Sequence, residues 1–533
     1  MRSNMKFWLA PLLAGILVGC GNPDESKPAA SATRQVVFGI DGGAQTQFQL
    51  DPHLIGFAPH NRMLRQIFDS LVVLLPNDET GPWLARSWEV SADNRTYTFH
   101  LKEGVTFHDG TVLDAAAVKF NFERMAEPAS FATYQDFDAY EKAEVVDPLT
   151  VRLFLKRPDA ALLNKLSKST FGIVSPAAVA KYGKEFASNP VGSGPFVFKS
   201  LSHGTQINLE RNPQYAWASA LFPDNAAPVI DRLILKNLPD ETTRIAALKS
   251  GQVDAVDIVP PQNLIELAAD KHFVVQQKEL LNHNFSLYFN TLRAPLDDEN
   301  VRTAVRLAID VDSIVKTLYL GRFKRAWSPL SPSLPGYDAS LENSWKYDPD
   351  QARKLLDGQG WILGQDGIRT RNGEKLRLVF VHFEGNREKR LDVITMVKNH
   401  LKKVGIDVVI DSVLGFNFEK IAKGEWNISN GSQFTSDPDV LRSIYRDRRA
   451  GGIRIITLAD DTLSAWLSQA SQETDKGQRR ERYKKIQERI IGKTYSVPIY
   501  VLPYTLAHSS RVSGIVLDQG GFPLFQSARI AQP

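Results

Sequence analysis

The sequence has few side chains at the spacings that enzymes use for chemistry. Cys20 is the only cysteine of the 533 residues, so the chain has no cysteine pair and no paired-cysteine metal motif. No His-Glu-x-x-His motif occurs, and Gly192-Ser193-Gly194 lacks the spacing of a nucleophile elbow. Gly492-Lys493-Thr494 matches the end of a phosphate-binding loop, but Gln487 occupies the position of its first glycine. We therefore expect no enzyme activity, no cofactor and no metal site.

Two carboxylates separated by one residue, Asp437 and Asp439, are the most prominent polar pair in the chain. They flank Pro438 directly before an expected helix at 440–445, so one hypothesis is that they cap that helix. The alternative is that Asp437 contacts a ligand or shapes a pocket. Arg442 and Arg446 lie one helical turn apart nearby, and they face either solvent or an anionic ligand.

The first 20 residues have the pattern of an export signal. Arg2 and Lys6 precede or border an apolar run at 7–18, which is shorter than the ~20 residues needed to cross a membrane. The run ends in Leu17-Val18-Gly19-Cys20, which resembles a bacterial lipobox, and Cys20 is then the lipid attachment site. The alternative is an ordinary secretory signal with an incidental cysteine. We expect a signal peptide at 1–19, a tether rich in Pro, Ser and Ala at 20–34, and a periplasmic body anchored to a membrane by lipid.

Charge and length restrict the class of protein further. Loss of Arg2 and Lys6 with the signal lowers the formal net charge from +4 to +2, which gives no reason to expect a nucleic-acid partner. A body of roughly 500 residues exceeds what one hydrophobic core supports, so we expect more than one domain.

Strand and helix patterns alternate along the body, which predicts an α/β fold. Residues 96–101 alternate apolar and polar side chains as a strand does, and Asp114 can cap the helix that follows. Further helices are expected at 61–73, 242–250, 297–310, 348–358, 391–404, 462–470 and 478–491, and further strands at 35–40, 230–238, 406–410 and 496–501.

Several segments, taken in order, resemble the family 5 solute-binding proteins of bacterial ABC importers, a group that includes dipeptide, oligopeptide and nickel receptors. The longest is Thr-Tyr-Thr-Phe-His-Leu-Lys-Glu-Gly-Val-Thr-Phe-His-Asp-Gly at 96–110. The others are 50–53, 67–71, 190–196, 209–213, 290–291, 301–310, 347–349 and 405–408. Each segment alone is weak evidence for the family, but the whole set in this order is specific to it.

This resemblance implies a two-lobed periplasmic binding protein fold (class II-like) with an extra subdomain in the first lobe. Lobe 1 would span 35–289 with the inserted subdomain at about 76–205, lobe 2 would span 290–500, and 501–533 would return to lobe 1. The implied function is capture of a peptide or related small polar solute in an interlobe cleft and delivery to the permease subunits. The alternatives are a receptor for nickel or a metal chelate, and a receptor that signals to a membrane sensor. We expect a monomer.

The resemblance also indicates where the ligand binds. In the dipeptide and oligopeptide receptors, an aspartate shortly before an Asp-Pro pair holds the α-amine of the ligand. Phe434 falls at that position, which argues against a free peptide N-terminus, because a buried ammonium without a carboxylate is costly. The tryptophan and tyrosine of the nickel receptors fall on Ser432 and Ser436. The ligand contacts that we expect are Gly42 and Gly43 after the first strand, and Gln433, Phe434, Thr435, Ser436 and Asp437.

Overall fold

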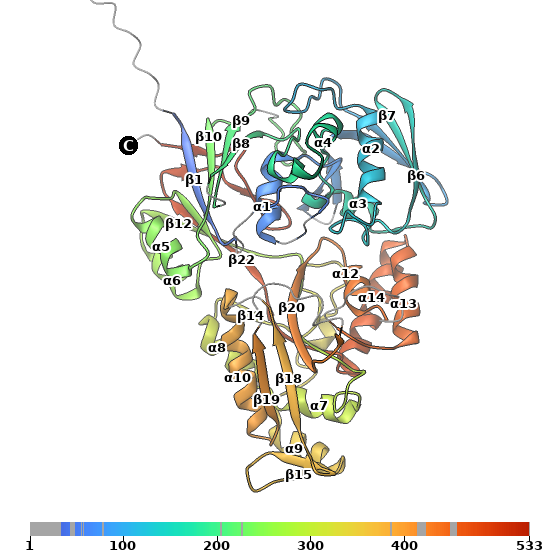
Figure 1. The fold of residues 1–533 in the computed structure, drawn as a ribbon, viewed down its shortest axis with the longest axis vertical. Coiled ribbons are helices and arrows are strands. Elements are labelled where there is room, and N and C mark those ends of the chain that lie inside the picture. Colours follow the sequence, from blue (N-terminus) through green and yellow to red (C-terminus); the bar gives the residue numbers. More distant parts are fainter. Residues whose placement is uncertain are drawn as a thin grey trace, which may run out of the picture. The chain divides into compact units, whose positions relative to one another are not determined.

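A computed structural model of the chain describes residues 33–531, except 43–47, 55, 57, 77–78, 203–204, 225–226, 384–385, 413–422 and 448–455 (Figure 1). The predicted signal peptide, Cys20, most of the predicted tether and Gly43 lie outside the described residues. Residues Arg34–Pro533 form one compact unit. Within the described ranges, no helix combines the length and the apolar character that crossing a membrane requires.

A seven-stranded mixed sheet forms the centre of lobe 1, with the order β12-β22-β11-β1-β10-β9-β8. Strand β1 pairs in parallel with β10 and β11, and the other pairs are antiparallel. The strands are β1 (Gln35–Ile40), β8 (Phe196–Ser202), β9 (Gln206–Arg211), β10 (Arg232–Asn237), β11 (Ala255–Asp257), β12 (Phe273–Glu279) and β22 (Pro503–Ser509). The helices of this lobe are α1 (Ala58–Ile67), α5 (Glu241–Lys249) and α6 (Pro261–Ala269).

The inserted subdomain is built on an antiparallel sheet of order β4-β5-β7-β6, with a hydrophobic core of its own. Its strands are β4 (Ala85–Val90), β5 (Thr96–Leu101), β6 (Tyr140–Asp147) and β7 (Thr150–Leu155), and its helices are α2 (Ala115–Met125), α3 (Leu162–Leu166) and α4 (Pro176–Tyr182). The short strands β2 (Val72–Leu75) and β3 (Glu79–Pro82) precede it. The predicted strand at 96–101 is confirmed, and Asp114 caps α2 by accepting from the amide of Ala117 at 2.9 Å.

A six-stranded sheet of order β14-β21-β13-β20-β18-β19 forms lobe 2. Its strands are β13 (Asn282–Phe289), β14 (Lys324–Arg325), β18 (Arg377–His382), β19 (Asp407–Ser412), β20 (Ile428–Phe434) and β21 (Ser496–Val501). The helices are α7 (Glu299–Leu307), α8 (Val311–Tyr319), α9 (Pro349–Gly358), α10 (Arg390–Lys402), α12 (Val440–Tyr445), α13 (Asp461–Gln472) and α14 (Lys476–Gly492). A small sheet of β15 (Ile362–Leu363), β16 (Arg369–Arg371) and β17 (Glu374–Lys375) completes this lobe.

The chain passes between the two large sheets twice, after β12 and between β21 and β22 (Figure 1). Strand β13, which the sequence analysis placed at the end of lobe 1, pairs with β20 and β21 in lobe 2. All eight of its residues are buried, so its pattern carries no sign of which sheet it joins. Strand β8, which falls inside the range predicted for the inserted subdomain, pairs with β9 in the sheet of lobe 1.

Candidate ligand-binding cleft

Four of the predicted ligand contacts, Gln433, Thr435, Ser436 and Asp437, lie where lobe 2 meets the inserted subdomain, and Phe434 lies between them in the sequence. Gln433 and Phe434 end β20, and residues 435–437 then lead into α12. The hydroxyl of Ser436 donates to the carbonyl of Asn164 in α3 at 3.1 Å, and the amide of Asn164 donates to the carboxylate of Asp437 at 3.0 Å. These hydrogen bonds join the two lobes directly at the predicted segment.

The carboxylate of Asp437 determines the shape of this segment. Arg479 donates two hydrogen bonds to it, at 2.6 and 3.0 Å, and the backbone amide of Asp439 donates a third at 2.8 Å. The hydroxyl of Thr435 both accepts from the amide of Asp437 at 3.0 Å and donates to its carbonyl at 2.8 Å. Asp437 is thus fully engaged by the protein, and the geometry favours a role in shaping the pocket.

The carboxylate of Asp437 accepts from the backbone amide of Asp439 at 2.8 Å in the turn that leads into α12, as the capping hypothesis predicts, but the hypothesis is wrong for Asp439. Asp439 is the residue before the helix, but its side chain makes no capping hydrogen bond, and its φ of −60° and ψ of −10° are helical. A capping side chain needs an extended backbone to reach the amides of the first turn. The carboxylate of Asp439 instead accepts from Arg442 at 2.9 Å and from the hydroxyl of Tyr483 at 3.1 Å.

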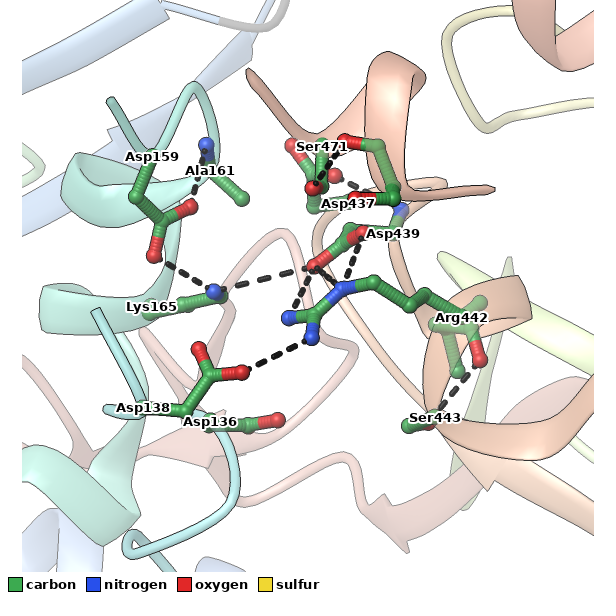
Figure 2. A network of polar contacts seen from close by, with 12 residues as sticks. Asp136, Asp138, Asp159, Ala161, Lys165, Asp437, Asp439, Arg442, Ser443 and Ser471 are labelled. Carbon is green, nitrogen blue, oxygen red and sulfur yellow. Dashed lines mark hydrogen bonds and ion pairs between the residues drawn. The ribbon is translucent and has the colours of Figure 1, made fainter. Parts of the chain in front are cut away.

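Charged groups from both lobes form one buried network around Asp439 (Figure 2). The ammonium of Lys165, which is 4% exposed, lies 2.6 Å from Asp159 in its own subdomain and 3.7 Å from Asp439 in lobe 2. The guanidinium of Arg442 reaches back to Asp138 of the subdomain at 3.0 Å. Burial acts to raise the pKa of Asp439, but the charges of Arg442 and Lys165 outweigh it and hold that pKa at about 2. Burial also raises the pKa of Asp159, against the charge of Lys165.

The predicted alternatives for Arg442 were solvent exposure or contact with an anionic ligand. Its side chain is 12% exposed and is held between Asp439 and Asp138, so it does not face solvent. The partners of Arg442 are carboxylates of the protein.

Phe434 contributes an apolar surface at the same place. Its ring packs against Phe522 of lobe 1, with the ring centroids 4.7 Å apart and the planes inclined by 60°. A methyl group on Gly520 would lie 2.5 Å from the ring of Phe434, so a larger residue at that position would have to displace this ring. Gln433, by contrast, is exposed, and its side chain accepts a long hydrogen bond of 3.5 Å from Ser443.

Gly42 lies at the end of β1, on the opposite side of the boundary between the lobes. Its amide donates to the side chain of Asn237 at 2.9 Å, and a methyl group at this glycine would lie 2.6 Å from the same oxygen. The neighbouring carboxylate of Asp41 lies 3.6 Å from the guanidinium of Arg387 in lobe 2. This ion pair connects the first predicted ligand segment with lobe 2.

Three charged residues that the sequence analysis missed link the two predicted segments. Arg387 contacts both Asp41 and Glu388, and Glu388 accepts from Arg390 at 2.8 Å. Arg390 also donates to the hydroxyl of Ser432, beside the segment 433–437, at 2.8 Å. Burial acts to raise the pKa of Glu388, but the two arginines outweigh it and hold that pKa at about 2.

The backbone at this link is strained. Glu388 and Lys389 have φ values of 53° and 58°, a conformation that costs non-glycine residues free energy and that persists where surrounding contacts hold it. In the sequence, Arg-Glu-Lys-Arg at 387–390 has the appearance of a solvated start of a helix, so no local signal separates these residues from surface charges.

A small cavity of about 30 Å³ lies beside the predicted segment. It is lined by Gln135, Asp136, Lys165 and Lys168 of the subdomain and by Gln433, Thr435, Asp437, Asp439, Val440, Arg442, Ser443 and Arg446 of lobe 2. In the part of the chain that the structure describes, no group of three or more His, Cys, Asp or Glu residues could hold a metal ion.

Comparison with known proteins identifies the family. The model of the bacterial extracellular solute-binding proteins, family 5 (middle), matches residues 79–453. The glutathione-binding protein GsiB of Salmonella paratyphi A is 27% identical over 529 residues, which cover 97% of each protein. Its counterpart in Escherichia coli K12 is 26% identical over 506 residues, covering 92% of this chain and 94% of the relative.

Solved structures give the same result. The ABC transporter-associated periplasmic binding protein DppA of Helicobacter pylori, in complex with the peptide STSA, matches with a TM-score of 0.80 and 25% identity, over 93% of this chain and 98% of that one. NikZ of Campylobacter jejuni, in complex with Ni(L-His), shares the fold with a TM-score of 0.79 and 21% identity, over 93% and 97% of the two chains. The predicted α/β fold with two lobes is confirmed, and the chain belongs to family 5 of the bacterial extracellular solute-binding proteins.

Proposed function

We propose that this protein is the receptor of an ABC importer, which binds a peptide-like solute between its two lobes and delivers it to the permease subunits. The observation that carries the proposal is the continuous link from Asp41 through Arg387, Glu388 and Arg390 to Ser432, because it joins the two predicted ligand segments across the lobes. The names of the relatives, a glutathione-binding protein and a periplasmic binding protein in complex with the peptide STSA, support a peptide-like ligand.

The polar groups at this place favour a ligand with a carboxylate and without a strong requirement for a free α-amine. Phe434, with its ring against Phe522, occupies the position at which the peptide receptors have an aspartate. Arg387 lies 3.2 Å from Glu388 and 3.6 Å from Asp41, and a ligand carboxylate would add to or replace the longer of these contacts. The ligand contacts we propose are Gly42, Gly43 and the segment 433–437, with Asp437 shaping the pocket.

Nickel or a metal chelate is the second candidate. The described residues hold no cluster of three or more metal-binding side chains, so a metal ion would have to arrive with its own chelator, as in the Ni(L-His) complex of NikZ. Recognition would then depend on the carboxylates of the chelator.

Ligand-dependent thermal unfolding of residues 34–533 tests the proposal. The panel contains glutathione, dipeptides and tripeptides with free and acetylated N-termini, and nickel with and without L-histidine. At 100 times the dissociation constant a ligand stabilises the protein by about 2.7 kcal/mol, which we expect for a peptide-like compound. Arg387→Gln should abolish the effect, while Arg377→Gln, whose side chain is 56% exposed, should preserve it. A shift with nickel and histidine alone would replace the first candidate with the second, and equal shifts in both variants would remove Arg387 from the site.

We also propose that the mature chain is a monomer held at the periplasmic face of a membrane by lipid on Cys20. Labelling of cells with radioactive palmitate tests this with the full chain. We expect incorporation into the wild-type protein and none into Cys20→Ser, and equal labelling of the two would refute the anchor.

A further inference from the structure

A second and larger cavity lies next to the Asp437–Arg479 ion pair. Its volume is about 470 Å³, within the range of small-molecule sites. Asp437 lines the small cavity beside the predicted ligand segment, whereas Arg479 lines this larger one, so the ion pair separates the two. None of the proposed ligand contacts lines the larger cavity.

Both lobes contribute walls to the larger cavity. The inserted subdomain supplies Trp88 and Tyr97 from its sheet and Asn164 from α3. Lobe 2 supplies Lys476 and Arg480 from α14. The cavity therefore exists only where the subdomain and lobe 2 are in contact.

The cations of this wall are placed against the usual preference of a helix. Lys476, Arg479 and Arg480 occupy the first turns of α14, and Asp475, directly before the helix, caps it by accepting from the amide of Gln478 at 2.8 Å. The amides at a helix N-terminus carry partial positive charge, so cations there are unfavourable. Arg479 is neutralised by Asp437, but Lys476 and Arg480 form no ion pair with any other described residue. Lys476 and Arg480 are exposed and line the cavity, so both cations are accessible to an anion that enters it.

The remaining wall is aromatic. The half-buried ring of Trp88 lines the same space as the two cations, whereas Tyr97 and Tyr483 are buried and the guanidinium of Arg479 lies over the ring of Tyr483. Among the described residues that line the cavity, Glu79 is the only one with a carboxylate. Aromatic faces beside unneutralised cations suit a small anion with a planar or apolar body.

We propose that this cavity is a second small-molecule site, which takes an organic anion of the size of an aromatic carboxylate. The anion pairs with Lys476 and Arg480 while its body lies against Trp88. An anion here also competes with Asp437 for Arg479, and Asp437 shapes the segment 433–437 through its hydrogen bonds. The site would thereby modulate the binding of the imported solute; this last step alone rests on the proposed function.

Binding of 4-bromobenzoate to residues 34–533, measured by titration calorimetry, tests the site. Charge-assisted hydrogen bonds carry the affinity, so Lys476→Glu with Arg480→Glu should weaken binding by about tenfold or more. The matched control is Lys484→Glu with Lys485→Glu, which makes the same charge change on the same helix outside the cavity and should alter affinity less than about twofold. All four side chains are on the surface or half-buried, and unfolding temperatures of both variants verify that they fold.

Anomalous scattering from crystals soaked in the same compound locates the bromine. A peak between Trp88 and Arg480 supports the site. A peak only beside the segment 433–437, no peak at all, or equal weakening in both double variants would overturn it. Binding of 4-bromobenzoate at this cavity without any response to the solute panel would refute the proposed function and leave this inference standing.

Discussion

Replacement of Lys165 by methionine should destabilise the protein strongly, because this ammonium is the shared cation of the network between the lobes. The side chain of Lys165 is 4% exposed, and its ammonium lies 2.6 Å from Asp159 and 3.7 Å from Asp439. Solvent therefore does not reach the two carboxylates through this side. Loss of one member of a buried ion pair costs about 3–5 kcal/mol, since the other charge stays buried and unpaired. Asp439 keeps Arg442, so the loss falls mainly on Asp159, which is 2% exposed.

The pH dependence gives the sharper test. Burial already raises the pKa of Asp159, and removal of Lys165 raises it further. A carboxyl group with a higher pKa in the folded than in the unfolded state binds more protons when folded, so its contribution to stability falls as the pH rises. The destabilisation by Lys165→Met should therefore be larger at pH 7.5 than at pH 5, where Asp159 takes up a proton.

We expect Lys165→Met to lower the free energy of unfolding by about 3 kcal/mol at pH 7.5, which corresponds to a fall in Tm of about 3–6 °C for a body of this size. Calorimetry of residues 34–533 at the two pH values measures it. Lys142→Met is the control, because this lysine pairs with Glu144 in the same subdomain but is 55% exposed, and surface pairs contribute about 0–1 kcal/mol. Equal Tm values for the two variants, or a greater loss at pH 5 than at pH 7.5, would refute the assignment.

Three further substitutions test other parts of the structure. Burial raises the pKa of Asp69 to about 7, so the wild type loses stability as the pH rises from about 4 to 7. Asp69→Asn should remove this loss, and calorimetry should then show a flatter dependence of stability on pH in this window. An unchanged slope would contradict the raised pKa. Gly192→Ala should lower the free energy of unfolding, measured with denaturant, by about 3 kcal/mol or more, because the new methyl group would lie 2.2 Å from the carbonyl oxygen of Ile67. A change below about 1 kcal/mol would show that the two backbone segments can move apart. Phe434→Asp should remove the ring contact with Phe522 and strengthen the binding of peptides with a free N-terminus relative to acetylated peptides in calorimetric titrations; an unchanged ratio would remove this position from ligand selection.

Local chemistry made some elements predictable from the sequence. The strand at 96–101 was predicted with correct ends because its side chains alternate between buried and partly exposed positions. Asp114 was identified as a helix cap because a carboxylate bonds an amide two or three residues further along the chain. These signals depend on near neighbours only, so no tertiary information was needed.

Elements whose structure depends on contacts with distant segments of the chain were not predictable in the same way. The helix predicted at 61–73 ends at Ile67, because Val72 begins strand β2 and pairs with Pro82. Asp439 failed as a cap because Lys165 and Arg442 hold its carboxylate, and Lys165 comes from another subdomain. Burial with a partner far away in the sequence overrode the local preference in both cases.

The candidate cleft was predictable only in part for the same reason. The segment 433–437 was proposed from a motif, but the link through Arg387 and Glu388 depends on a left-handed backbone at two consecutive charged residues, which no propensity favours. Its reason appears only in three dimensions, where Tyr500 and Arg390 hold the carboxylate of Glu388. Strain of this kind is retained where the surrounding contacts over-determine it.

The segment 433–439 combines two tasks that mutations should separate. Its first residues, with Phe434 against Phe522, face the place proposed for the ligand, while Asp437 and Asp439 bind the subdomain through Asn164 and Lys165. The proposed ligand binds with the two lobes closed on each other. Loss of contacts between the lobes makes this closed arrangement less populated, so ligand binding must supply the free energy of closure. The affinity for every ligand then falls by the same factor. Loss of about 1 kcal/mol from the contacts between the lobes should thus weaken all ligands about fivefold and leave their order unchanged. Changes at Phe434 should alter the order itself, so the ranking of ligands, and not the absolute affinity, identifies the residues that select the solute.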